Sequence, residues 1–105
     1  MEVINSDFFI GDKVENTKGE PIGKIRNIML NVQYGKIECI IIEFGGFMGL
    51  GEKLFAVPFT ALQLNRHKQD FVLDVDKSFL EKAPGFDKDH WPETNGHYFV
   101  SLDKD

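Results

Sequence analysis

A glycine-rich stretch in the middle of the chain has the residue types that most resemble a site of chemistry. Residues 43–53 read EFGGFMGLGEK, and Gly46 and Gly51 have the spacing of the glycines in the phosphate-binding motif G-x-x-x-x-G-K-[ST]. That motif needs a lysine at the next position, where this chain has Glu52, whose carboxylate would repel phosphate. A strand-like segment, LFAVPF, follows in place of the required helix. The sequence therefore disfavours phosphate binding.

Phe47, Met48 and Leu50 give the same loop another interpretation. Their side chains either fold back over one end of the domain or stay partly exposed and contact a partner. Large exposed apolar patches on soluble proteins usually mark contact sites. We therefore predict a partner interface at these three residues.

The remaining candidates for chemistry are histidines, acidic residues and one cysteine. Asp87, His90 and His97 are weak candidates for a zinc site, because imidazole and carboxylate suit zinc but their spacing fits no standard pattern. Cys39 lies in an apolar run with no base near it in the sequence, so packing is expected rather than reaction. We expect no catalytic residues, no cofactor and no bound metal.

Charge and length restrict the class of protein. The 105 residues suit a single domain, 1–105, and the net charge is −5. All of this excess lies in residues 70–105, with nine acidic and four basic residues, so nucleic-acid binding is not expected. There is no basic segment followed by an apolar core at the start, and no apolar stretch approaches the ~20 residues of a membrane span. These features predict a cytoplasmic protein without membrane insertion.

Short β-rich segments separated by turn residues predict an all-β domain followed by a short helix. The consecutive apolar residues 28–30 break the alternation of the second segment, which predicts a β-bulge near Asn27. Asp76 is the expected N-cap of the helix, and Pro84 and Gly85 are expected to end it. The expected strands are 12–16, 22–31, 37–44, 53–59, 61–65 and 71–75, with a helix at 77–83 and a further strand at 98–102.

The segment 37–44, IECIIIEF, is apolar on both of its faces. Ile37, Cys39 and Ile41 share one face, and Ile40, Ile42 and Phe44 share the other. We predict that Ile41, Val57 and Leu73 lie inside the domain. The opposite face must be covered, either by the C-terminal third or by a second copy. We predict a homodimer whose interface combines the loop residues with the outward side chains, namely Phe47, Met48, Leu50, Ile40, Ile42 and Phe44.

Several of these stretches together resemble the PRC-barrel family, which includes the barrel of the photosynthetic reaction centre H subunit and that of the ribosome maturation factor RimM. The resemblance spans roughly residues 8 to 93 and is carried by GDKV at 11–14, N-x-x-GE-x-IG-x-I at 16–25, GKI at 35–37, FGGFMGLGEK at 44–53, VPF at 57–59, APGFD at 83–87 and WP at 91–92. It implies a small six-stranded antiparallel barrel over about 8–76, followed by a short helix and an acidic extension over 77–105. It also implies a docking role rather than an activity.

The sequence thus leaves two functional hypotheses. The first is a non-enzymatic docking or adaptor module that self-associates and binds another protein. The alternative is a small ligand- or metal-binding protein, or an enzyme, whose site lies between the barrel and the acidic tail.

Overall fold

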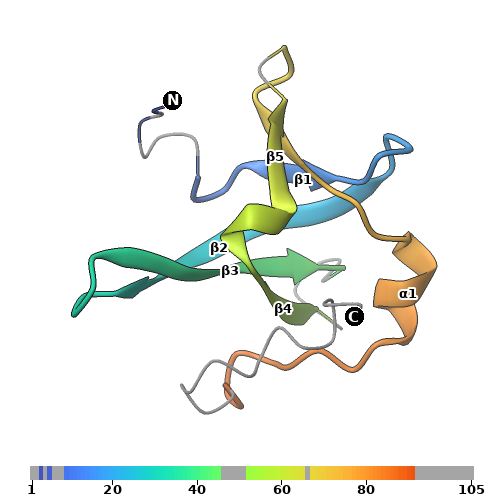
Figure 1. Cartoon of the computed structure of the whole chain (residues 1–105). Helices are drawn as coiled ribbons and strands as arrows, with labels where there is room; N and C mark the ends of the chain where they lie inside the picture. The colour runs from blue at the N-terminus through green and yellow to red at the C-terminus, as the bar shows by residue number, and fades with distance from the viewer. Residues whose placement is uncertain (1–2, 4, 6–8, 46–51, 66, 92–105) are drawn as a thin grey trace.

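A computed structural model of the chain describes residues 3, 5, 9–45, 52–65 and 67–91 (Figure 1). The described residues form a curled β-sheet with one short α-helix, as the sequence predicted. Pro58, which lacks a backbone N–H, ends the fourth strand as expected. The elements are β1 (Lys13–Glu15), β2 (Pro21–Asn31), β3 (Lys36–Phe44), β4 (Lys53–Val57), the 3-10 turn η3 (Phe59–Ala61), β5 (Leu62–Asn65), β6 (Asp70–Leu73) and α1 (Lys77–Lys82). The strand predicted at 98–102 lies outside the described residues.

The strand order is β4-β3-β2-β1-β6-β5, and one pairing differs from the prediction. Neighbouring strands pair antiparallel except β1 and β6, which pair parallel, with Val14 opposite Phe71. The sheet is therefore mixed, and the prediction of a purely antiparallel barrel was wrong. The parallel pair joins the first and last of the described strands, so it depends on how the whole sheet curls rather than on a local hairpin.

The predicted irregularity in β2 is present. The register with β3 shifts between Ile25 and Asn27, so Arg26 is an extra residue on β2. This shift lets Ile25 and Ile28 both face the main core although they are three positions apart. At Gly23 the two strands approach so closely that a Cβ atom would collide with the backbone carbonyl of Glu43.

The two faces of β3 belong to two separate apolar clusters. Ile40, Ile42 and Phe44 lie in the main core and are at most 7% exposed, so their assignment to an outer contact surface was wrong. Val57 and Leu73 share this core, as predicted. The second cluster, on the opposite face, consists of Cys39, Ile41, Leu54 and Ala56, with Met29 and Phe86 packed against it. Ile41 is buried, but on the face opposite to the predicted one.

The helix α1 follows β6 and covers the main core. Its Leu80 side chain and the following Ala83 are buried there, whereas Phe79 is exposed. Asp76 occupies the predicted N-cap position, but its side chain makes no capping hydrogen bond. Among the residues described, no helical segment has the length and hydrophobicity that crossing a membrane requires.

Candidate functional site

The predicted interface residues Phe47, Met48 and Leu50 lie outside the described residues. The other three, Ile40, Ile42 and Phe44, are core residues and offer no surface. Glu52, whose carboxylate disfavours phosphate binding at the glycine-rich loop, forms an ion pair with Arg26, with Nη1 and Oε2 3.1 Å apart. Among the described residues, a hollow lies at the start of β4 and exposed apolar side chains lie at the tip of the β2–β3 hairpin.

A segment after α1, residues 83–91, runs along the outer edge of β4, and we call it the strap. The backbone N–H of Leu54 donates to the carbonyl of Phe86 at 2.7 Å, and the N–H of Phe86 donates to the carbonyl of Leu54 at 2.9 Å. This is an isolated antiparallel bridge. The Phe86 ring packs on the second cluster, and the Trp91 ring lies 5.2 Å from it between centroids. The strap therefore adds apolar cover to the outer face of β3 and β4.

The side chain of Lys53 fastens the end of α1 to β4. Its Nζ atom donates to the backbone carbonyls of Leu80 at 3.1 Å, Glu81 at 2.6 Å and Ala83 at 2.9 Å. The last carbonyls of a helix have no partner within the helix and carry partial negative charge, so an ammonium group is a favourable cap. Lys53 thus fixes the point from which the strap departs.

Two of the three weak candidates for metal ligands meet in the strap. Asp87 Oδ1 and His90 Nδ1 are 2.7 Å apart, while His97 lies outside the described residues. The hydrogen bond with His90 lowers the pKa of Asp87, and the same bond raises the pKa of His90. Both side chains are exposed. Within the described part of the chain, no group of three or more His, Cys, Asp or Glu side chains is arranged to hold a metal ion.

A shallow hollow of about 520 Å³ lies where the strap meets the start of β4. Its lining combines charged and apolar side chains, so it resembles a surface recess more than an enclosed pocket. The lining residues are Glu52, Lys53, Pro84, Gly85, Phe86, Asp87 and His90.

Cys39 packs as the sequence predicted. It lies buried in the second cluster, and burial, with a smaller contribution from the charge of Glu38, raises the pKa of its thiol to about 11. The thiol is therefore protonated at neutral pH and is a poor nucleophile.

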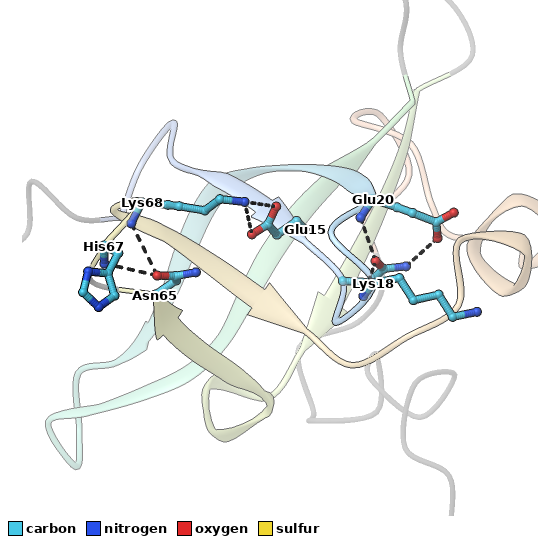
Figure 2. A network of polar contacts seen from close by, with 7 residues as sticks. Glu15, Lys18, Glu20, Asn65, His67 and Lys68 are labelled. Atoms are coloured by element: carbon cyan, nitrogen blue, oxygen red, sulfur yellow. Dashed lines mark hydrogen bonds and ion pairs between the residues drawn. The ribbon is translucent and has the colours of Figure 1, made fainter.

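A polar network ties the end of β1 to the turn that leads from β5 into β6, the strand that pairs with β1 (Figure 2). Lys68 Nζ contacts both carboxylate oxygens of Glu15 at 3.2 Å, and Asn65 Oδ1 accepts the backbone N–H groups of His67 and Lys68. Asp70 is buried beside this pair, where desolvation and then the negative charge of Glu15 raise its pKa. These contacts stabilise the parallel pairing of the two strands.

Asn16, the first residue of the motif at 16–25, supplies a second polar support. It is buried, and its Oδ1 accepts the N–H groups of Lys18 and Glu20 at 3.0 and 2.9 Å. Its Nδ2 donates to Glu20 Oε1 at 2.8 Å and to the carbonyl of Val75 at 3.2 Å. The β1–β2 turn is therefore tied to the segment that leads into α1.

The tip of the β2–β3 hairpin presents apolar side chains that the sequence analysis missed. Leu30, Val32 and Tyr34, which we call the hairpin tip, are 64%, 89% and 67% exposed. The hairpin projects from the sheet at the opposite side of the view from α1 (Figure 1). The three residues occupy alternate positions, a pattern that also describes a buried strand face, so spacing alone gave no signal of exposure.

The tip is held in a defined shape. Asn31 Oδ1 accepts the backbone N–H groups of Gln33 and Tyr34 at 3.1 Å, and its carbonyl accepts the N–H of Gly35 at 2.8 Å. Asn31 Nδ2 also donates to Glu38 Oε1 at 3.3 Å. Gly35 has a φ of +68°, which glycine adopts without strain. The apolar side chains therefore stand on an ordered turn.

The sequence profile of a family described as PRC-barrel domain matches residues 1–80, about three quarters of the chain. A search of curated proteins finds no match.

Proposed function

The chain belongs to the PRC-barrel domain family, and from that premise we propose that it is a non-enzymatic docking module that binds another protein. The observation that carries this proposal is the hairpin tip, where Leu30, Val32 and Tyr34 are all more than 60% exposed. Exposed large apolar side chains gathered on a projecting, ordered turn are typical of a contact site.

The tip has two properties of a good docking element. The hydrogen bonds of Asn31 fix its conformation before binding, which reduces the conformational entropy that association would remove. Tyr34 supplies a large amphipathic ring, a residue type enriched at the energetic centres of interfaces. The partner that fits is a protein with an apolar groove that accepts these exposed side chains.

Affinity capture from the native host with matched variants tests the docking role. Val32→Asp with Tyr34→Asp places charge on the tip, and Gln33→Asp is the control, because it adds a charge to the same turn without removing an apolar side chain. We expect a specific partner to be captured by the wild type and the control but not by the double variant. Capture of the same partners by all three proteins would contradict the proposal.

We also propose that the protein self-associates as a homodimer. The support is the sequence of the glycine-rich loop, in which the apolar residues Phe47, Met48 and Leu50 lie between glycines. Light scattering at micromolar concentration should give twice the chain mass of 12.0 kDa. A mass of 12.0 kDa would contradict self-association. If Phe47→Asp with Met48→Asp leaves the dimer intact, the loop is not part of the interface.

The hollow between β4 and the strap supports a second candidate function, the binding of a small ligand or a metal ion. It lies at the place expected for such a site and contains the His90 imidazole. Zinc titration followed by calorimetry tests it with two histidine variants. Under this hypothesis His90→Gln abolishes binding, and His67→Gln, in a polar turn away from the hollow, does not. Absence of micromolar zinc binding by the wild type removes the metal hypothesis.

A further inference from the structure

The parallel pairing of β1 with β6, which we call the seam, has a buried carboxyl group beside it. Asp70 is 8% exposed, and its Oδ1 atom has no hydrogen-bond partner. Burial of a carboxylate without a partner is costly, so such atoms are rare in folded proteins. We propose that Asp70 and Glu15 form a proton-binding pair across the seam, in which protonated Asp70 donates an O–H hydrogen bond to the Glu15 carboxylate and tightens the seam.

The register of the seam brings the two carboxyl groups together. Val14 lies opposite Phe71, and both side chains belong to the main core. Glu15 is the next residue on β1 and Asp70 is the preceding residue on β6, so alternation places both on the other face of the sheet. Their side chains are within hydrogen-bonding reach of each other. A single proton between them replaces the repulsion of two carboxylates by a hydrogen bond.

Lys68 decides which of the two groups is the acceptor. Its Nζ atom contacts both carboxylate oxygens of Glu15 at 3.2 Å. The Glu15 side chain is 14% exposed, so the ammonium group offsets a negative charge that has little contact with water. Asp70 makes no ion pair with Lys68 at this distance, and its Oδ1 has no donor. Asp70 is therefore the group that gains most from taking up a proton.

The other charged side chains next to Asp70 come from β1 and from the turn before β6. Lys13 on β1 and His67 in the turn are both exposed. β5, the other neighbour of β6, has no charged side chain. Arg66 lies outside the described residues. Among those described, Glu15 is thus the acidic group that pairs with Asp70.

The direction of the pH dependence follows from the burial of Asp70. Desolvation and then the negative charge of Glu15 raise the pKa of Asp70 from 3.8, and Lys68 opposes this rise. The folded state therefore holds the proton more tightly than the unfolded chain does. The stability that the pair contributes is complete below pH 3.8 and is lost as pH rises through the raised folded-state pKa.

The position of the pair gives the proton a structural consequence. In the described sheet, β5 pairs with β6, and β6 joins the remaining strands through β1. The seam itself is short, since its register consists of Val14 with Phe71 and Glu15 with Val72. One added side-chain hydrogen bond is therefore a large part of what holds β5 and β6 to the sheet. Mild acid should hold these two strands more firmly than neutral pH does.

Carbon-13 NMR of the side-chain carboxyl groups tests the pair in the full chain. We expect the titration midpoint of Asp70 to lie above 3.8 in the wild type, and Glu15→Gln should move it toward 3.8, because a neighbouring negative charge is removed. Glu81→Gln, on the exposed surface of α1, is the control and should leave the midpoint unchanged. A wild-type midpoint at or below 3.8, or the same midpoint in Glu15→Gln and the wild type, overturns the proposal.

Amide hydrogen exchange, corrected for the intrinsic effect of pH, tests whether the proton tightens the seam. Protection of the Phe71 and Val72 amides, relative to those of β3, should rise as the pH of the wild type is lowered from neutral. The rise is at most roughly tenfold for each unit by which the pKa of Asp70 is raised.

Asp70→Asn keeps the shape of the side chain without its charge and still offers an N–H donor to Glu15. This variant should show the higher protection already at neutral pH and no further rise in acid. The control Asp74→Asn, at an exposed position just after β6, should behave as the wild type does. Protection in β6 that does not rise in the wild type, or that rises equally in Asp70→Asn, overturns the proposal.

Discussion

The hairpin tip and the second cluster are both apolar, yet they differ in their exposure to solvent. Leu30, Val32 and Tyr34 are exposed to solvent, whereas Cys39, Ile41, Leu54 and Ala56 are buried. Both sets lie on the β2–β3 or β3–β4 hairpins, and both follow strand-like alternation. The difference is that Phe86 packs on the second cluster and not on the hairpin tip. Phe86 follows the start of β4 by more than 30 residues.

This comparison shows what exposure depends on. Alternation of apolar residues fixes which side chains share a face of a strand. Whether that face is covered depends on where later segments of the chain lie, and here the position of the strap is set by Lys53 and the bridge at Leu54. A region that keeps its apolar side chains exposed on an ordered turn is the better candidate for docking.

Of the substitutions that test this contrast, truncation of Ile41 should have the largest effect on the free energy of unfolding. Ile41→Ala removes buried methyl groups from the second cluster and leaves a cavity, so we expect a loss of about 3 kcal/mol in the free energy of unfolding. Leu30→Ala at the hairpin tip should cost less than about 0.5 kcal/mol, because its side chain is already exposed. Urea denaturation measures both. Equal losses in the free energy of unfolding of the two variants would show that the two regions are buried to the same extent.

Removal of the Lys53 ammonium should have the next largest effect. Lys53→Met leaves the carbonyls of Leu80, Glu81 and Ala83 without this donor, and we expect a loss of roughly 2 kcal/mol in urea denaturation. Lys82→Met is the matched control, because Lys82 lies in the last turn of the same helix. A similar small loss in both variants would mean that Lys53 does not fasten the helix end.

The contact of the strap with the second cluster can be weakened at a single ring. Phe86→Ala should cost about 1.5 kcal/mol through lost apolar contact and should shift the emission of Trp91, the only tryptophan, to longer wavelength. Phe79→Ala, on the exposed side of α1, should change neither stability nor emission appreciably. If Trp91 emission is the same in both variants, its ring does not depend on Phe86.

The smallest effect is expected from pH, through Asp87 and His90. The pKa of His90 is raised from 6.5 by the bond to Asp87, so its contribution is complete below pH 6.5 and is lost as pH rises through the folded-state pKa. The pKa of Asp87 is lowered from 3.8 by the same bond, so its contribution is present above pH 3.8 and is lost as pH falls through the lowered value. The pair therefore favours the observed strap geometry most between these two pH values.

An NMR titration of the imidazole protons checks this pair. Wild-type His90 should titrate above 6.5, and Asp87→Asn should bring its pKa back toward that value, because the negative charge and the strong acceptor are removed. A His90 pKa that is the same in both proteins would show that the two side chains do not interact in solution.

Much of the fold could be predicted from the sequence because the responsible signals are local. Pro58 marked the end of β4, and the run of apolar residues after Asn27 marked the bulge in β2. The family resemblance was confirmed by the profile match over residues 1–80. The parallel pairing of β1 with β6 has no local signal, because the two strands meet only when the whole sheet curls.

The candidate site was less predictable. Asp87 and His90 were only weak candidates for a common metal site, and they pair at 2.7 Å because they are three positions apart in a tight turn. The assignment of Ile40, Ile42 and Phe44 to the outside was wrong, because alternation defines two faces of a strand without saying which one the sheet encloses. The hydrogen bonds from Lys53 to the end of α1 join residues about 30 positions apart, and no pattern in the sequence indicated them.

The parallel pairing of β1 with β6 also governs how this protein can fold. Val14 lies opposite Phe71, a separation of 71 − 14 = 57 residues, whereas β2 and β3 are joined by a tight turn. During synthesis the β2–β3 hairpin can form early, but β1 must wait for β6 to leave the ribosome. Pairings that span so much of a chain raise the entropic barrier to folding and place a domain among those that fold in milliseconds to seconds. Until β6 has been synthesised, the edge of β1 that pairs with β6 has no neighbouring strand. The nascent chain is most exposed to aggregation during this period.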